Sequence, residues 1–246
     1  MGRRGLGTMP SKGFIFPDQE ALILGAAERI SRAVRRDCRR SGRCALGLSG
    51  GSTPRGVYEA LSRPPFSGLI PWTRLDLFFS DERCVPPEHP ESNFRMAWEA
   101  LLSKVTIPEF RIHRMRAEQG PERSARDYEA ELRRVLGPRG RLDILLLGVG
   151  EDGHTASLFP GSAALQEERA WTAPARSPDG QDRVTLTLPF INRSSRIMVL
   201  ACGQAKAGVL RKIFSSSAEA HPARRISRCR TTWLLDAEAA GQTPVV

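Results

Sequence analysis

The chain has 246 residues, of which 40% are hydrophobic and 26% are charged. This length allows one large α/β domain or two small ones, with a substantial core. No apolar run approaches the roughly 18 residues of a membrane span. The two arginines near the N-terminus precede no apolar stretch, so neither a secretory nor a twin-arginine signal is predicted. We therefore expect a cytoplasmic protein with no membrane partner.

The formal net charge of +10 has two interpretations. One is nucleic-acid binding, and the other is a basic protein that acts on an anionic small molecule. The arginines are spread along the chain singly and in pairs, such as Arg35-Arg36 and Arg39-Arg40. There is no zinc-finger, RRM-type or basic-zipper pattern. We favour a solvated arginine-rich surface and expect no nucleic-acid partner.

The five cysteines are odd in number and widely scattered. They form no Cys-x-x-Cys motif and no cluster with histidine, so neither a disulfide framework nor a structural zinc site is predicted. Most of them suit small buried positions. Cys84 could be a nucleophile only beside a base, and the sequence indicates none.

Helical spacing of apolar residues over 18–36 predicts a first helix with Asp18 as its N-cap. A short strand is expected at Cys44–Leu48, and Pro54 begins the next helical pattern. Between them stand Ser49, Gly50, Gly51, Ser52 and Thr53. A strand, a glycine turn with hydroxyls and a helix start suit a phosphate. The same residues also suit an ordinary turn and cap, and they match neither the Walker A nor the dinucleotide pattern.

A second buried strand is expected at Leu75–Phe79, and charged residues follow it. Arg83 can clamp a phosphate through its planar guanidinium. Asp81 or Glu82 could orient a hydroxyl or act as a base. A surface cluster of ion pairs is the alternative for this segment.

Residues 143–148 form a third apolar run, which Gly148, Gly150 and Gly153 bring to an end. His154 follows directly. Loops at the carboxyl ends of strands are where open α/β sheets bind ligands, and a histidine there can exchange protons near neutral pH. A loop histidine with a purely structural role is the alternative.

The remaining patterns continue the alternation of strands and helices. Helices are expected at residues 91–105, 121–136 and 236–240, strands at residues 183–188, 196–201 and 231–235, and a polar loop at residues 171–181. Lys206 lies in the first turn of a further helix, where the helix dipole disfavours a cation. A bound anion would compensate for this charge, although a surface lysine placed there by chance is an equally good explanation. This alternation favours an α/β fold with a largely parallel sheet in one domain.

Taken together, several motifs resemble the 6-phosphogluconolactonase branch of the glucosamine-6-phosphate isomerase/6-phosphogluconolactonase family. They occur in the family's order over roughly residues 17 to 240. The motifs are SGGSTP at 49–54, SDERCV at 80–85, SNFR at 92–95, GVGEDGHTASLFP at 148–160, GQAKA at 203–207 and WLLD at 233–236.

The resemblance implies a Rossmann-like α/β domain, with a mainly parallel central sheet flanked by helices on both faces. We expect it to span residues 17–246, after a flexible N-terminal extension at residues 1–16. It implies an enzyme of the pentose phosphate pathway that hydrolyses 6-phospho-D-glucono-1,5-lactone, with no metal and no organic cofactor. The sequence itself does not fix the oligomeric state, and we expect a monomer.

In this interpretation His154 is the general base and acid, and Asp152 holds its imidazole. Arg83 and Lys206 bind the substrate phosphate together with residues 49–53. Two alternatives stay open. A deaminase on an amino-sugar phosphate is disfavoured by Phe159, which stands where the deaminases carry Glu, and by Arg83, where they usually carry Tyr. A non-catalytic protein that binds sugar phosphate or nucleic acid is the other.

Overall fold

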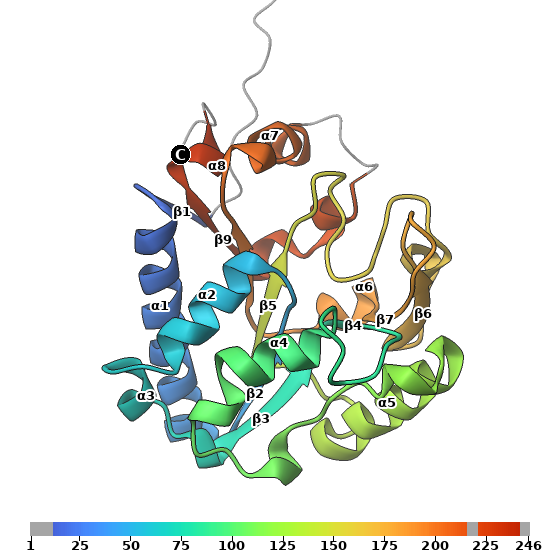
Figure 1. Cartoon of the computed structure of the whole chain (residues 1–246), viewed down its shortest axis with the longest axis horizontal. Coiled ribbons are helices and arrows are strands. Elements are labelled where there is room, and N and C mark those ends of the chain that lie inside the picture. The colour runs from blue at the N-terminus through green and yellow to red at the C-terminus, as the bar shows by residue number, and fades with distance from the viewer. Residues whose placement is uncertain (1–11, 216–220, 242–246) are drawn as a thin grey trace, which may run out of the picture.

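The computed structural model of the chain describes residues 12–215 and 221–241. Within them, six strands form a parallel sheet in the order β1-β9-β8-β5-β2-β3 (Figure 1). The strands of this sheet are β1 (Gly13–Phe16), β2 (Cys44–Leu48), β3 (Leu75–Phe79), β5 (Ile144–Gly148), β8 (Ile197–Ala201) and β9 (Thr231–Asp236). The expected Rossmann-like sheet flanked by helices is confirmed.

The helices lie mostly where the apolar spacing predicts them. They are α1 (Gln19–Ser41), α2 (Ser52–Leu61), α3 (Phe66–Leu69), α4 (Asn93–Ala100), α5 (Pro121–Leu136), α6 (Leu188–Ile191), α7 (Ala207–Phe214) and α8 (Ala237–Ala240). The side chain of Asp18 accepts a hydrogen bond from the Ala21 amide, so it caps α1 as expected. Ser92 caps α4 in the same way through the Arg95 amide, which is why α4 begins later than the sequence suggests.

A second, antiparallel sheet was not expected. It contains β4 (Asp81–Arg83), β7 (Asp182–Leu186) and β6 (Thr172–Arg176), in that order. The prediction of a polar loop over 171–181 is therefore wrong. Pro174 obscures the strand because proline has no N–H to donate, but β6 lies at the edge of the sheet, where proline is tolerated.

The N-terminal part of the sheet also begins earlier than expected. Gly13–Phe16 pair with β9 as strand β1, within the segment assigned to an extension, so the sheet starts before residue 17. Phe14 and Ile15 are partly exposed because β1 is an edge strand. Residues 1–11 of that predicted extension, and residues 242–246 of the predicted domain, lie outside the described residues.

Strands β2, β3 and β8 are buried along their whole length. Their apolar side chains join those of β5 and β9 in one core cluster. Because these strands run parallel, their carboxyl ends meet at one edge of the sheet, and the loops that leave them converge there. None of the helices within the described residues is long and apolar enough to cross a membrane.

Candidate active site

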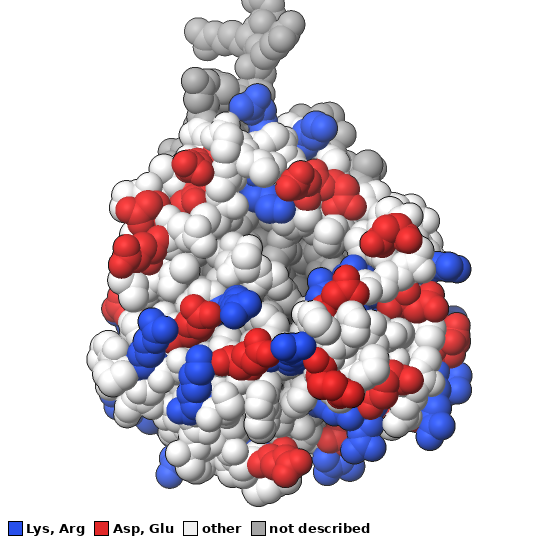
Figure 2. Space-filling view, in the orientation of Figure 1, with Lys and Arg blue, Asp and Glu red and all other residues white. Residues whose placement is uncertain are grey.

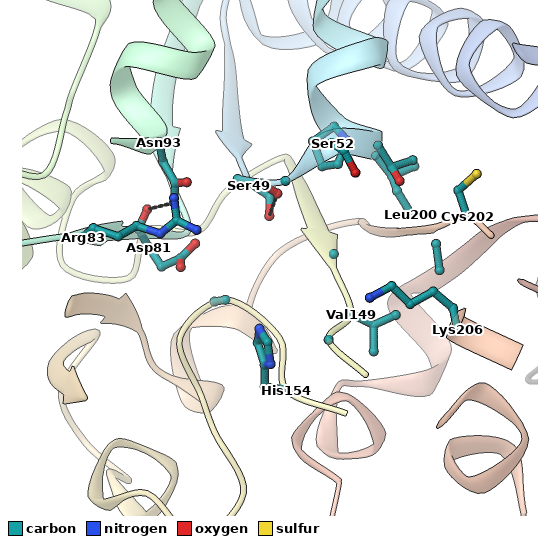
Figure 3. Close-up of a pocket in the computed structure, with 18 of the residues that line it drawn as sticks. Ser49, Ser52, Asp81, Arg83, Asn93, Val149, His154, Leu200, Cys202 and Lys206 are labelled. Atoms are coloured by element: carbon teal, nitrogen blue, oxygen red, sulfur yellow. Dashed lines mark hydrogen bonds between the residues drawn. The ribbon is translucent and has the colours of Figure 1, made fainter. Parts of the chain in front are cut away.

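A cavity of about 230 Å³ lies at this carboxyl edge of the sheet. It is lined by residues from the loops after β2, β5 and β8, and by strands β4 and β7. Among the predicted site residues, the cavity brings together Ser49, Gly50, Gly51, Ser52, Thr53, Asp81, Arg83, His154 and Lys206. Figure 3 shows Arg83 and Lys206 entering from opposite sides, with His154 between them.

His154 and Asp152 form a close pair in the turn after β5. Oδ1 of Asp152 lies 2.6 Å from Nδ1 of His154, and it also accepts a hydrogen bond of 3.0 Å from the His154 amide. An ionised carboxylate only accepts, so Nδ1 carries the proton and Nε2 keeps its lone pair. Burial alone would raise the pKa of Asp152, but the hydrogen bonds and charge of His154 outweigh it and hold that pKa below its ordinary value.

The imidazole of His154 also contacts an apolar ring. The ring centroids of His154 and Phe159 are 4.7 Å apart, and Phe159 is buried. Gly150 leaves the space for this arrangement, since a Cβ atom there would lie 2.1 Å from His154 Nδ1. The ring is therefore confined between a carboxylate, a glycine and a phenylalanine.

Two residues far along the chain hold the same turn, and the sequence analysis missed both. Nδ1 of His221 lies 3.0 Å from the Asp152 carbonyl oxygen, and the Ala223 amide donates to the Gly153 carbonyl at 3.0 Å. Because a carbonyl only accepts, Nδ1 of His221 must be the donor. A lone histidine next to proline carries no sequence signal for this contact.

The glycine-rich turn after β2 leads directly into α2. Gly51 is the N-cap residue, with φ of 109°, and no side chain caps this helix end. The first amides of α2 are therefore available to an anion, which the helix dipole favours. Gly50 packs against Asn93, whose Oδ1 would lie 2.1 Å from a Cβ atom at position 50. Asn93 itself lines the cavity, whereas the sequence analysis named it only as part of the SNFR motif and gave it no role in the site.

The two carboxylates after β3 have different environments. Asp81 lines the cavity, and its two oxygens accept hydrogen bonds from Ser80 Oγ at 2.9 Å and Ser157 Oγ at 2.7 Å. Glu82 does not line it. Its carboxylate accepts from the amides of Asn93 and Phe94 at 2.7 and 2.8 Å, so it holds the start of α4. Burial, only partly offset by these amides, raises the pKa of Glu82 above its ordinary value.

The cavity holds a second arginine, Arg183 on β7, which the sequence analysis missed. Burial lowers the pKa of Arg183, and the charge of Arg83 lowers it further. The Nε atoms of both arginines are buried and have no hydrogen-bond partner within the described residues. On the opposite side, Nζ of Lys206 lies 3.9 Å from Oε1 of Glu151, a long and exposed ion pair. These cations are thus poorly neutralised by the protein itself.

Neither cysteine near the cavity is set up as a nucleophile. Burial raises the pKa of the Cys84 thiol to about 12, and Cys84 does not line the cavity. Burial likewise raises the pKa of Cys202 to about 12, helped by the hydrogen bond between its thiol and Asp236. Across the described part of the chain, no three His, Cys, Asp or Glu side chains are grouped so that they could hold a metal ion.

A family model described as glucosamine-6-phosphate isomerases/6-phosphogluconolactonase matches residues 17–234. The chain belongs to this family. It is 39% identical to a 6-phosphogluconolactonase of Nostoc, over 94% of this chain and 98% of the relative. It is 40% identical to one of Synechocystis, over 89% and 91%.

A solved structure of the family agrees with the fold. The 6-phosphogluconolactonase from Trypanosoma cruzi superposes with a TM-score of 0.87 at 31% identity. The match covers 98% of this chain and 99% of that one. The carboxyl-edge cavity and its loops lie inside the segment that the family model matches.

Proposed function

We propose that this chain hydrolyses 6-phospho-D-glucono-1,5-lactone to 6-phospho-D-gluconate, with His154 as the group that moves protons. The observation that carries the proposal is the 2.6 Å contact between Asp152 and His154 at a cavity that Arg83, Arg183 and Lys206 also line. The family membership and the 39–40% identity to 6-phosphogluconolactonases support the same reaction.

The phosphate of the substrate carries about −1.5 to −2 charges near neutral pH. Arg83, Arg183 and Lys206 supply positive charge, and the free amides of α2 supply hydrogen-bond donors. A phosphate held by these groups fixes the sugar at a point remote from the lactone carbonyl. Binding energy from the remote group then positions the reacting carbon, which raises the rate of the chemical step.

Hydrolysis begins with the attack of water on the lactone carbonyl. The lone pair on Nε2 of His154 takes a proton from the water as the C–O bond forms. Asp152 keeps the other nitrogen protonated and stabilises the imidazolium that results. Amides of the glycine-rich turns are candidates to stabilise the oxyanion.

The tetrahedral intermediate then collapses and breaks the bond to the ring oxygen. The imidazolium of His154 returns its proton to this leaving oxygen, which becomes the hydroxyl of the open acid. The new carboxylic acid gives its own proton to the solvent near neutral pH, because its pKa is about 4, and His154 is neutral again for the next substrate. No metal or organic cofactor enters these steps.

The deaminase alternative requires a further acid at the His154 loop. Phe159 is the residue at the position where the resemblance places Glu in deaminases, and its ring contacts the imidazole at 4.7 Å. An apolar ring neither donates nor accepts the protons of ring opening and amine release. This contact favours the lactonase.

A coupled assay with freshly generated lactone tests the proposal directly. The rate must be corrected for spontaneous hydrolysis, since the lactone opens in water unaided. We expect hydrolysis above the spontaneous rate, and no ammonia from glucosamine-6-phosphate. Ammonia release at a rate above lactone opening would reject the lactonase in favour of the deaminase.

We further propose that the enzyme acts as a monomer in the cytoplasm. A single copy of the chain brings nine of the predicted site residues to one cavity, so the proposed reaction needs no residue from a partner. Light scattering coupled to size exclusion tests it, and a concentration-independent mass near 27.2 kDa is expected. Fractionation of the source cells tests the location.

A further inference from the structure

Arginine residues stand at the amino ends of the central strands, opposite to the active-site edge. Arg43, Arg74, Arg196 and Arg230 each come directly before a strand of the sheet, and Arg141 comes three residues before β5. In parallel strands these starting points share one edge. The fold therefore brings arginines that are almost 190 positions apart in the sequence to one edge of the sheet.

The strand register shows how close some of them are. Cys44 pairs with Leu75, so Arg43 and Arg74 each lie one residue before a paired position. Leu46 pairs with Ile144, and the same register continued by three residues sets Arg43 beside Arg141. Neighbouring strands are about 4.8 Å apart. Arg43 and Arg74 therefore precede two adjacent strands at the same level, and Arg141 precedes β5, the strand on the other side of β2.

Helix α1 adds a second row of arginines at this edge. It begins at the carboxyl edge of the sheet and ends at Ser41, two residues before Arg43, so its last turns lie at the amino edge (Figure 1). Spacings of three and four residues place its arginines on one face. They line a shallow hollow formed by Arg32, Arg35, Arg36, Arg39 and Arg40.

Most of these charges are unpaired. We use the name arginine edge for six residues whose guanidinium groups make no hydrogen bond or ion pair within residues 12–215 and 221–241: Arg35, Arg39, Arg40, Arg43, Arg74 and Arg141. The nearby acids are engaged elsewhere. Asp37 is buried against Arg196, and Asp143 accepts a hydrogen bond from the Ala45 amide.

We propose that the arginine edge binds the phosphate backbone of nucleic acid, without reading the base sequence. The guanidinium fork matches phosphate oxygens, and a row of such groups neutralises successive phosphates. The proposal lies beyond the lactonase reaction, because the cavity is at the other end of the same strands. It also departs from the expectation of no nucleic-acid partner, which treated the arginines as scattered.

The surroundings of the arginine edge favour a nucleic acid over a protein or a membrane. Protein interfaces have an apolar centre, and membrane-surface helices insert apolar side chains. Two of the exposed large hydrophobic side chains of the described residues, Leu69 and Phe110, lie as single residues near the amino end of β3, and the others, Phe14, Ile15, Leu24 and Trp98, belong to β1, the first turns of α1 and α4. The face that holds the cavity is different again, since acidic and basic side chains alternate around it (Figure 2).

Fluorescence anisotropy of a labelled 20-base-pair duplex, titrated with the whole protein at several salt concentrations, tests the proposal. The variant Arg35→Gln/Arg39→Gln/Arg40→Gln removes three charges from the edge. A matched control, Arg123→Gln/Arg126→Gln/Arg169→Gln, removes three exposed charges from α5 and from the loop before β6. Both variants thus have the same net charge.

The edge variant should bind the duplex at least about tenfold more weakly than the parent at 50 mM salt, and its salt dependence should flatten by roughly 0.9 per lost phosphate contact. The control should bind like the parent. Both variants should hydrolyse the lactone at the parent rate.

Three results would overturn the assignment. Equal losses in the two variants would mean that only net charge matters. Tighter binding to anionic vesicles or to polyglutamate than to the duplex, at equal salt, would assign the edge to another partner. Inhibition of lactone hydrolysis by the duplex would mean that the backbone occupies the cavity instead.

Discussion

Arg83 and Arg183 lie directly opposite each other on the antiparallel strands β4 and β7, and both side chains line the cavity. Two like charges in this position repel each other, and their buried Nε atoms lack partners within the described residues. An anion placed between them would relieve both costs at once. We therefore propose that the pair binds the substrate phosphate.

Replacing Arg183 with Gln should raise KM with little change in kcat. A charge-assisted hydrogen bond contributes roughly 1.5–3 kcal/mol, which corresponds to a factor of about 10 to 150. Arg83→Gln should act in the same direction. Steady-state kinetics with the lactone measure both.

Arg176→Gln is the matched control for this pair, since Arg176 is an exposed arginine of the same small sheet that does not line the cavity. Its kinetics should equal those of the parent. A large loss of kcat at unchanged KM in Arg183→Gln would contradict phosphate binding and indicate a role in the chemical step.

His154→Ala should lower kcat by about 10² to 10⁴ while KM changes little, because proton transfer is lost and the phosphate site is intact. Asp152→Asn should also lower kcat. An amide can donate to Nδ1, which then moves the proton to Nε2 and blocks its action as a base. A His154→Ala enzyme with near-normal kcat would reject the mechanism.

His221 should be a positioning residue for this turn. His221→Ala removes the donor to the Asp152 carbonyl, and we expect kcat to fall about fivefold at unchanged KM, since a hydrogen bond of this kind contributes about 1 kcal/mol. His221→Asn keeps an N–H donor near the same place and should restore most of the rate. If both variants lose activity equally, the contact with Asp152 does not matter for catalysis.

The contacts of the buried His113 with two carboxylates should make the stability of the fold depend on pH in the acid range. Its Nδ1 lies 2.7 Å from Glu131 Oε1, and its Nε2 lies 3.6 Å from Asp76 Oδ1. Burial alone would raise the pKa of Asp76, but hydrogen bonds and charges from His113 and Arg111 hold it below its ordinary value. A hydrogen bond from Arg134, then one from His113, lower the pKa of Glu131.

Both carboxyls therefore release their protons more readily in the folded chain than in the unfolded chain. The stabilisation that these two carboxylates contribute is complete above their ordinary pKa values of 3.8 and 4.5. It is lost as the pH falls through their lowered pKa values in the folded chain. His113→Gln should lower Tm at pH 7 by about 5 °C and flatten the decline of Tm below pH 4.5. An unchanged acid profile would exclude this cluster as its cause.

Much of the fold follows from local patterns in the sequence. Runs such as Ile197–Ala201 are apolar throughout, and the strands they form are buried on both faces of the parallel sheet. The small antiparallel sheet was found only in part, because the pattern over residues 183–188 predicted β7 but β4 and β6 were missed. Its strands are short, one begins with Asp81, and another contains Pro174, so their apolar signal is weak.

The site was predictable where its residues follow strands directly. Residues 49–53 and His154 come just after β2 and β5, and the fold brings them to one cavity. Arg183 and His221 carry no such local signal. Each acts through a contact with a residue distant in the chain, Arg83 in one case and Asp152 in the other, and only the tertiary structure brings them together.

The parallel direction of the central strands has a practical consequence. The carboxyl ends of these strands face the lactone cavity, and their amino ends face the arginine edge. A surface bound to the arginine edge therefore leaves the cavity accessible to substrate. The protein should therefore adsorb to a cation-exchange bead by the arginine edge, with the mouth of the cavity facing the solution. An enzyme immobilised in this orientation would keep the turnover of the free enzyme, without a tag or a chemical linker.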